Sequence, residues 1–222
     1  MNLLKELLEA EFYSGKPLEK GGTSIAGDAA PAIRALYGKA IKDGDTVLDY
    51  GAGKYARNAD FFRKKGIKAF AFDPFNSNAT EKEGWDEGKV ADAVSLKTNG
   101  GKKFSVAFTC FVLNVVPKNV EAEIIAKSEK LGKKTVHITR NMDVFDMVKS
   151  AMLKKDKYVY PFYVKEYNKG KDVDPKKLTD EDIMEFCKFG VQTSRGFQRI
   201  PDLESYSYKL VRNTSGFKIY EK

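Results

Sequence analysis

Two glycines and the residues around them form the part of the chain most suited to chemistry. Gly51 and Gly53 follow a short apolar stretch, residues 46–50, and precede residues 54–65, whose apolar spacing predicts a helix. Glycines between a strand and a helix let the backbone approach a ligand and turn its amide groups toward that ligand. We therefore expect the residues of this turn to border a bound ligand: Tyr50, Gly51, Ala52 and Gly53.

Two acidic residues near this turn indicate what such a ligand carries. Asp49 lies two residues before Gly51. A carboxylate there suits a positively charged group, such as the amino-acid end of S-adenosylmethionine, and suits a pyrophosphate poorly. Asp73 ends a second predicted strand, 22 residues after Gly51. An acid at that place can accept hydrogen bonds from ribose hydroxyls.

The same glycines permit two other interpretations. Gly51-x-Gly53-x-x-Ala56 matches the dinucleotide fingerprint with alanine in third place, and Asp73 would then hold the adenosine ribose of NAD. A glycine turn between strand and helix can also be a tight turn that binds nothing. Dinucleotide sites usually have an uncharged residue at the place of Asp49, because the nearby phosphates are negative. Asp49 therefore favours S-adenosylmethionine.

Predicted strands and helices alternate through the first 140 residues. The apolar patterns predict strands at 46–50, 68–72, 104–108 and 135–139, with a weaker one within 89–96. They predict helices at 1–13, 28–40 (capped by Asp28), 54–65 and 119–130, with a loop at 14–27. Alternation of this kind favours a parallel sheet with helices on its faces.

The chain changes character after residue 140. We predict helices at 144–154 and from Thr179 to Gly190, and an aromatic, β-prone stretch at 158–167. Strands are predicted at 192–200, 206–212 and 217–220, which could complete an antiparallel edge of the same sheet. No linker separates these parts, so we expect residues 1–222 to form one domain.

Four segments together resemble class I S-adenosylmethionine-dependent methyltransferases. They are the first motif Val47-Leu-Asp-Tyr-Gly-Ala-Gly53, the acid Asp73, the segment Ala91-Asp92-Ala93 with Leu96, and residues 104–117. The resemblance implies an α/β, Rossmann-like fold, with a mainly parallel seven-stranded sheet, helices on both faces and an antiparallel edge. It also implies that residues 141–190 hold an insertion near the active site that helps choose the substrate.

The resemblance also implies roles for particular residues. S-adenosylmethionine would be the cofactor, with Asp49 and the turn at 50–53 near its methionine part. Asp73 would hold the ribose, Asp92 the adenine amino group, and Phe111 would wall the site. A catalytic residue does not stand out. His137, the only histidine, lies inside a predicted strand and is interpreted as structural.

The methyl acceptor is left open by the sequence. Net charge is +8, which favours an anionic partner such as nucleic acid, although only seven of the 39 basic residues are arginine. Residues 109–117 lack the Asp/Asn-Pro-Pro-Tyr/Phe signature of many DNA amino-methyltransferases, and no Pro-Cys pair is present. A small molecule or a protein side chain is therefore an alternative acceptor. A non-catalytic protein that binds S-adenosylmethionine or NAD is a third possibility.

The overall composition indicates in which cellular compartment the protein works. Two cysteines, Cys110 and Cys187, are too few for a disulfide framework, and we expect no metal site. No apolar run approaches the roughly 18 residues needed to cross a bilayer, and the acidic amino terminus is unlike a signal peptide. We therefore expect a cytoplasmic protein with no membrane partner.

Overall fold

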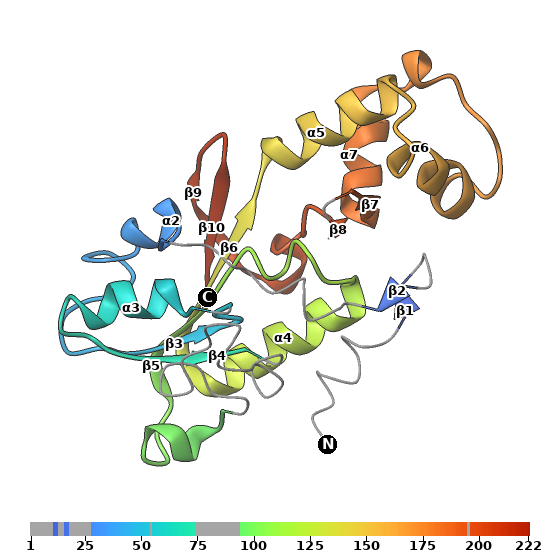
Figure 1. The fold of residues 1–222 in the computed structure, drawn as a ribbon. Coiled ribbons are helices and arrows are strands. Elements are labelled where there is room, and N and C mark those ends of the chain that lie inside the picture. The colour runs from blue at the N-terminus through green and yellow to red at the C-terminus, as the bar shows by residue number, and fades with distance from the viewer. Residues whose placement is uncertain (1–10, 13–15, 18–27, 54, 74–93, 195) are drawn as a thin grey trace.

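The computed structural model describes residues 11–12, 16–17, 28–53, 55–73, 94–194 and 196–222 (Figure 1). Its centre is a six-stranded sheet in the order β4-β3-β5-β6-β10-β9. In chain order these strands are β3 (Thr46–Tyr50), β4 (Lys68–Phe72), β5 (Phe104–Cys110), β6 (Gly132–Arg140), β9 (Lys209–Asn213) and β10 (Phe217–Glu221).

The first four strands of this sheet are parallel, as predicted. Val47 lies opposite Ala69 on one side and Val106 on the other, so β3 is a central strand with neighbours on both edges. β10 then pairs antiparallel with β6, and β9 pairs antiparallel with β10. The strand order and the antiparallel edge confirm the Rossmann-like α/β fold class.

One expected strand is not seen in the sheet. The prediction within 89–96 falls mostly on residues outside the described part of the chain. Its described end belongs instead to a 3₁₀ helix, Leu96–Asn99, which opens with a Ser95 capping box. Among the residues that the structure describes, the central sheet therefore has six strands, where the resemblance implied seven.

Helices cover both faces of the sheet. On one face α2 (Pro31–Arg34) and α3 (Arg57–Arg63) pack through buried Ile33, Ala59 and Phe62. On the other face α4 (Lys118–Leu131) packs through residues such as Ile124. The sheet thus has an α3 face and an α4 face. The side chains of β3 alternate between them, with Val47 on the α3 face and Leu48 on the α4 face.

Helix α2 is much shorter than predicted. Pro31 opens it, as expected, but Ala30 is the N-cap, no side chain caps it, and it ends at Arg34. Asp28 therefore does not cap this helix. The next residues turn back, with Ile41 donating its amide to the carbonyl of Leu36. Leu36, Ala40 and Ile41 are buried in the turns that follow this single helical turn.

Residues 141–198, here called the helical region, follow β6 directly and lie apart from the sheet (Figure 1). They have an apolar core of their own, built around Val148, Phe162 and Phe186. The elements are α5 (Met142–Leu153), α6 (Val159–Phe162), a π-helix (Tyr163–Tyr167), a 3₁₀ helix (Pro175–Lys177), α7 (Asp180–Phe189), β7 (Val191–Thr193) and β8 (Gly196–Gln198).

The prediction of a β-prone stretch at 158–167 is wrong. These residues form α6 and the π-helix, because their apolar side chains follow a helical spacing. Val159, Phe162, Tyr163 and Tyr167 lie three to four residues apart and pack on α7, where the Tyr163 ring meets Phe186 edge to face at 4.8 Å. Burial of one helical face outweighs the β propensity of aromatic residues.

The remaining described elements are short. β1 (Glu11–Phe12) pairs with β2 (Lys16–Pro17), so the helix expected at 1–13 is wrong at its end; residues 1–10 and 13 lie outside the described part. A 3₁₀ helix, Glu204–Tyr206, precedes β9. Among the described residues, no helix is both long and apolar enough to cross a bilayer.

Candidate cofactor site

Asp49 lies at the carboxyl end of the central strand β3, fully buried. It follows Val47 on the α3 face, and neither of its carboxylate oxygens accepts a hydrogen bond of ordinary geometry. Burial, and then the charge of Asp73, raise the pKa of Asp49 to about 8; the Ala59 amide and Arg63 lower it only in part. Asp49 is therefore a largely protonated, unpartnered acid at neutral pH.

The glycine turn is attached to the end of β4. The amides of Gly51 and Ala52 both donate to the Phe72 carbonyl, at 2.8 and 2.9 Å. The amide of Gly53 donates to Asp73 Oδ2 at 2.9 Å. The expectation that these amides face a ligand is therefore wrong. They hold the turn against the neighbouring strand instead.

Gly51 has no room for a side chain. Its φ is +95°, and a Cβ placed on it would lie 2.4 Å from Cγ2 of Val112. Gly53 also has a positive φ, +70°. Position 51 therefore requires glycine, because the segment after β5 approaches it closely.

Asp73 follows β4 and is buried, with 5% of its surface exposed. Its charge reaches Asp49, since it raises the pKa of that carboxyl. The two acids that the sequence singled out therefore lie close together at the carboxyl ends of neighbouring parallel strands, where open α/β sheets bind ligands. Arg63 lowers the pKa of Asp49 only in part, so two adjacent buried carboxyls favour a ligand that supplies further positive charge.

The end of β5 and the residues that follow it border the candidate cofactor site, beside the ends of β3 and β4. Phe111 has a φ of +61°, donates its amide to the Ile138 carbonyl at 2.8 Å, and lies under the guanidinium of Arg140, 5.7 Å from its ring centre. Burial and the charge of Asp49 raise the pKa of Cys110 well above its usual value, so the thiol stays protonated. Phe111 and Cys110 are half-buried.

Of the other predicted site residues, two are buried in the core and one lies outside the described part of the chain. Tyr50 is buried on the α4 face, with its ring centre 4.7 Å from that of Phe72, so its side chain lies on the face opposite Asp49. Ala52 is buried in the core on the α3 face. Asp92 lies outside the described residues.

Sequence reasoning missed the structural role of Asn114. This fully buried side chain accepts from the Arg140 amide at 2.8 Å and donates to the Arg199 carbonyl at 2.8 Å. The backbone carbonyl of Asn114 accepts from the backbone amide of Arg199 at 2.7 Å. Arg199 in turn forms a buried ion pair with Glu121 on α4. Asn114 thereby holds both ends of the helical region against the segment after β5.

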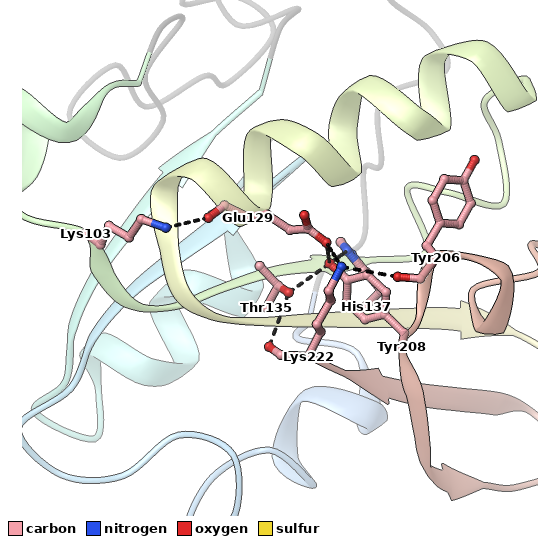
Figure 2. A network of polar contacts seen from close by, with 7 residues as sticks. All are labelled: Lys103, Glu129, Thr135, His137, Tyr206, Tyr208 and Lys222. Atoms are coloured by element: carbon pink, nitrogen blue, oxygen red, sulfur yellow. Dashed lines mark hydrogen bonds and ion pairs between the residues drawn. The ribbon is translucent and has the colours of Figure 1, made fainter.

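His137 is structural, as interpreted from the sequence. Its Nδ1 lies 2.9 Å from Thr109 Oγ1. Its Nε2 lies 3.1 Å from Tyr208 Oη (Figure 2). Tyr208 continues the network to Glu129 at 3.1 Å. Burial lowers the pKa of His137 to about 3, so the ring is neutral and fully engaged. It is not placed to act as a base.

No known family model matches the sequence, and no curated protein matches it. Similar folds occur among solved structures. A protein described as a zinc-dependent alcohol dehydrogenase from Rhodobacter sphaeroides covers 99% of this chain and 95% of its own, with 12% identity and a TM-score of 0.49.

Two further solved structures are methyltransferases by description. Magnesium protoporphyrin IX methyltransferase from Synechocystis PCC 6803, with bound S-adenosylhomocysteine, covers 80% of this chain and 73% of its own, with 12% identity and a TM-score of 0.42. An O-methyltransferase family protein from Burkholderia thailandensis covers 80% and 50%, with 15% identity and a TM-score of 0.43. Likenesses this distant say nothing of ligand or reaction, which must be inferred from the chain's own residues.

Proposed function

We propose that this chain binds S-adenosylmethionine at the carboxyl end of β3 and transfers its methyl group to an acceptor. The observation that carries the proposal is the buried, unpartnered carboxyl of Asp49. A buried polar group without a partner costs about 1–3 kcal/mol, and native structures rarely retain one without a reason. A cationic ligand group beside Asp49 would supply the missing partner. The amino-acid end of S-adenosylmethionine carries such a group.

The backbone amides argue against the dinucleotide alternative. A pyrophosphate at a glycine turn is normally held by free amide groups at the start of the helix. Here the amides of Gly51, Ala52 and Gly53 are already bonded to Phe72 and Asp73. A pyrophosphate would also bring negative charge next to two carboxyls. Both features favour a cationic ligand over NAD.

In this reaction the chain's own residues would bind the cofactor and orient it toward the acceptor. Asp49 would release its proton and hold the cationic group, Asp73 would accept from ribose hydroxyls, and Phe111 would wall the site. From the resemblance, Asp92 would contact the adenine amino group. The bound cofactor supplies an electrophilic methyl group on sulfur. The protonated Cys110 and the engaged His137 offer no base, so placing the acceptor in line with the methyl group would carry the catalysis.

The acceptor is proposed in two versions. Nucleic acid is favoured by the net charge of +8. A small molecule or protein side chain is favoured by the helical region, which follows the carboxyl end of β6 and which we assign to acceptor choice. Residues 141–190 contain ten basic and ten acidic side chains, so they offer no excess of positive charge to phosphates. A protein that binds the cofactor without transferring its methyl group is a separate alternative, motivated by the lack of an evident base among the described residues.

Calorimetry with S-adenosylmethionine, S-adenosylhomocysteine and NAD tests the cofactor. Both sulfur ligands should bind, and NAD should not. Asp49→Asn should weaken both sulfur ligands about 10- to 100-fold, because a hydrogen bond to a charged group contributes about 1.5–3 kcal/mol. Glu123→Gln, on the opposite face, is the matched control. Binding of NAD alone would show the proposal to be wrong. Transfer of labelled methyl groups to RNA, protein or small-molecule fractions of an extract then separates the acceptors.

A further inference from the structure

Lysines gather at the amino ends of the parallel strands, the edge of the sheet opposite the candidate cofactor site. Strands β3, β4, β5 and β6 begin there in register, with Thr46 opposite Lys68 and Phe104 opposite Gly132. Six exposed lysines, here called the lysine row, lie just before these strands or in their first two residues: Lys42, Lys64, Lys65, Lys68, Lys102 and Lys133.

The lysine row is not neutralised by ion pairs. Within the part of the chain that the structure describes, none of its six side chains pairs with a carboxylate. Lysines of the helical region do pair, for example Lys149 with Asp180 and Lys188 with Glu185. Residues 141–190 contain ten basic and ten acidic side chains, so the excess positive charge of the protein lies outside them, and the lysine row is part of that excess.

The acids nearby offset only part of this charge. Asp43 and Asp45 lie in the turn before β3, where Asp43 accepts from the Tyr37 hydroxyl and Asp45 from the Lys42 amide. Glu129, at the end of α4, pairs with Lys222 and Tyr208. A seventh lysine, Lys103, donates to the Glu129 carbonyl and adds to the positive edge. Among the described residues, the six lysines of the row therefore outnumber the three neighbouring carboxylates, those of Asp43, Asp45 and Glu129.

The spacing of the lysine row suits an extended polyanion. Neighbouring strands lie about 4.8 Å apart, so the four strand ends extend the charges over roughly 15 Å. A single phosphate would meet one or two of these side chains, whereas a nucleic-acid backbone repeats its charge along the whole row. All six are lysines, which act as point charges on phosphates and do not supply the bidentate contacts by which arginine reads bases.

An anionic membrane fits this edge less well. The large apolar side chains exposed among the described residues are Met142, Leu153, Tyr158, Leu210 and Val211, in the helical region and β9. None of them lies at the four strand ends, so within the described part of the chain no exposed large apolar side chain accompanies the lysine row to insert into lipid. We propose that the lysine row docks the phosphate backbone of a nucleic acid, with little sequence preference.

This docking surface goes beyond the proposed methyl transfer. The cofactor site lies at the other ends of the same strands, and a strand of five residues rises roughly 17 Å. The segment of nucleic acid that lies on the lysine row therefore does not itself contact Asp49. The row anchors a polyanion whether or not that polyanion is the methyl acceptor.

The test is fluorescence anisotropy with a labelled 30-nucleotide RNA and a labelled DNA duplex, over a salt series. The triple variant Lys65→Glu, Lys102→Glu, Lys133→Glu is compared with the control Lys157→Glu, Lys171→Glu, Lys176→Glu. The two have the same net charge, and the control substitutions lie on exposed positions of the helical region. Each set includes one lysine that stacks on a tyrosine, Lys65 on Tyr37 and Lys157 on Tyr158.

We expect the lysine-row variant to bind at least tenfold more weakly than the unsubstituted protein, and the control to change little. The slope of log affinity against log salt should fall by about two to three, since each phosphate contact contributes about 0.7–0.9. Equal losses in both variants, no loss in either, or no nucleic-acid binding by the unsubstituted protein would overturn the proposal. Binding only to phosphatidylserine vesicles would overturn it in favour of a membrane. Affinity for S-adenosylmethionine, measured on the same variants, reports separately on the proposed function.

Discussion

Asn114 holds Arg199 by both backbone polar groups, its carbonyl accepting from the Arg199 amide and its side-chain amide donating to the Arg199 carbonyl. The same side chain accepts from the Arg140 amide. One buried residue therefore fixes the two points where the chain leaves the sheet for the helical region and returns from it. Its loss would leave several buried backbone groups without partners.

We predict that Asn114→Leu lowers the free energy of unfolding by roughly 2–4 kcal/mol, because each buried polar group left unpaired costs about 1–3 kcal/mol. Urea denaturation followed by circular dichroism measures this. Asn119→Ala, at an exposed position of α4, should change stability by less than about 0.5 kcal/mol. A loss at Asn114 no larger than that of the control would show that the three hydrogen bonds do not hold the region.

Binding of a cation beside Asp49 should release a proton. The pKa of Asp49 is raised to about 8, so the carboxyl is mostly protonated at pH 7 in the free protein. A cationic partner lowers that pKa and drives the proton off. Calorimetry of S-adenosylmethionine at pH 7, in buffers of different ionisation enthalpy, should show close to one proton released, and fewer at pH 9. Asp49→Asn should abolish the release; if release persists in that variant, its source is another group.

Asp49 should also make the protein less stable as pH rises. The folded protein holds the Asp49 proton up to about pH 8, while the unfolded chain loses it near pH 4, so its contribution to stability falls between these values. Asp49→Asn should therefore gain stability relative to the unsubstituted protein as pH increases from 5 to 9, by on the order of a few kcal/mol. Urea midpoints at three pH values measure it. A constant difference would contradict the raised pKa.

His137 should have the opposite dependence at low pH. Burial lowers its folded pKa to about 3, and the unfolded value is near 6.5, so the unfolded chain binds the extra proton between these values. Stability due to this residue is therefore lost as pH falls from about 6.5 to 3. His137→Gln, which does not titrate, should be less stable at pH 7 and should lose less stability on acidification. Parallel acid dependences for the two proteins would be inconsistent with a buried neutral histidine.

Gly51→Ala should destabilise the fold by about 2–3 kcal/mol, because it combines a positive φ with overpacking against Val112. Val112→Ala in the same chain removes the atom that the new Cβ would meet. The double variant should recover the packing part of the loss and retain the backbone part. Thermal unfolding of the two single variants and the double variant gives the coupling, and strict additivity would mean that Val112 is not the obstacle.

The sequence allowed the central part of the fold to be predicted because the information there is local. An apolar strand, two glycines and a helix adjoin each other at 46–65, and the alternation repeats along β4, β5 and β6. Asp49 and Asp73 could be placed at strand ends from spacing alone. Their approach to each other then follows from parallel pairing of β3 with β4.

What could not be predicted depends on distant partners. The amides of the glycine turn bond to the end of β4, which no local pattern encodes. Asn114 and Arg199 are 85 residues apart. The aromatic composition of residues 158–167 favours a strand. The stretch is helical because the three-to-four spacing of its apolar side chains lets it pack on α7, which lies later in the sequence.

The hydrogen bonds of Asn114 have a consequence for how this protein can vary. Because one side chain reaches both Arg140 and Arg199, the entrance and exit of the helical region are neighbours in space. A segment with adjoining ends can be lengthened, exchanged or deleted without stretching the scaffold that carries it. Residues 141–198 can thus be replaced as one unit, in evolution or by protein engineering, without moving the strands that position Asp49.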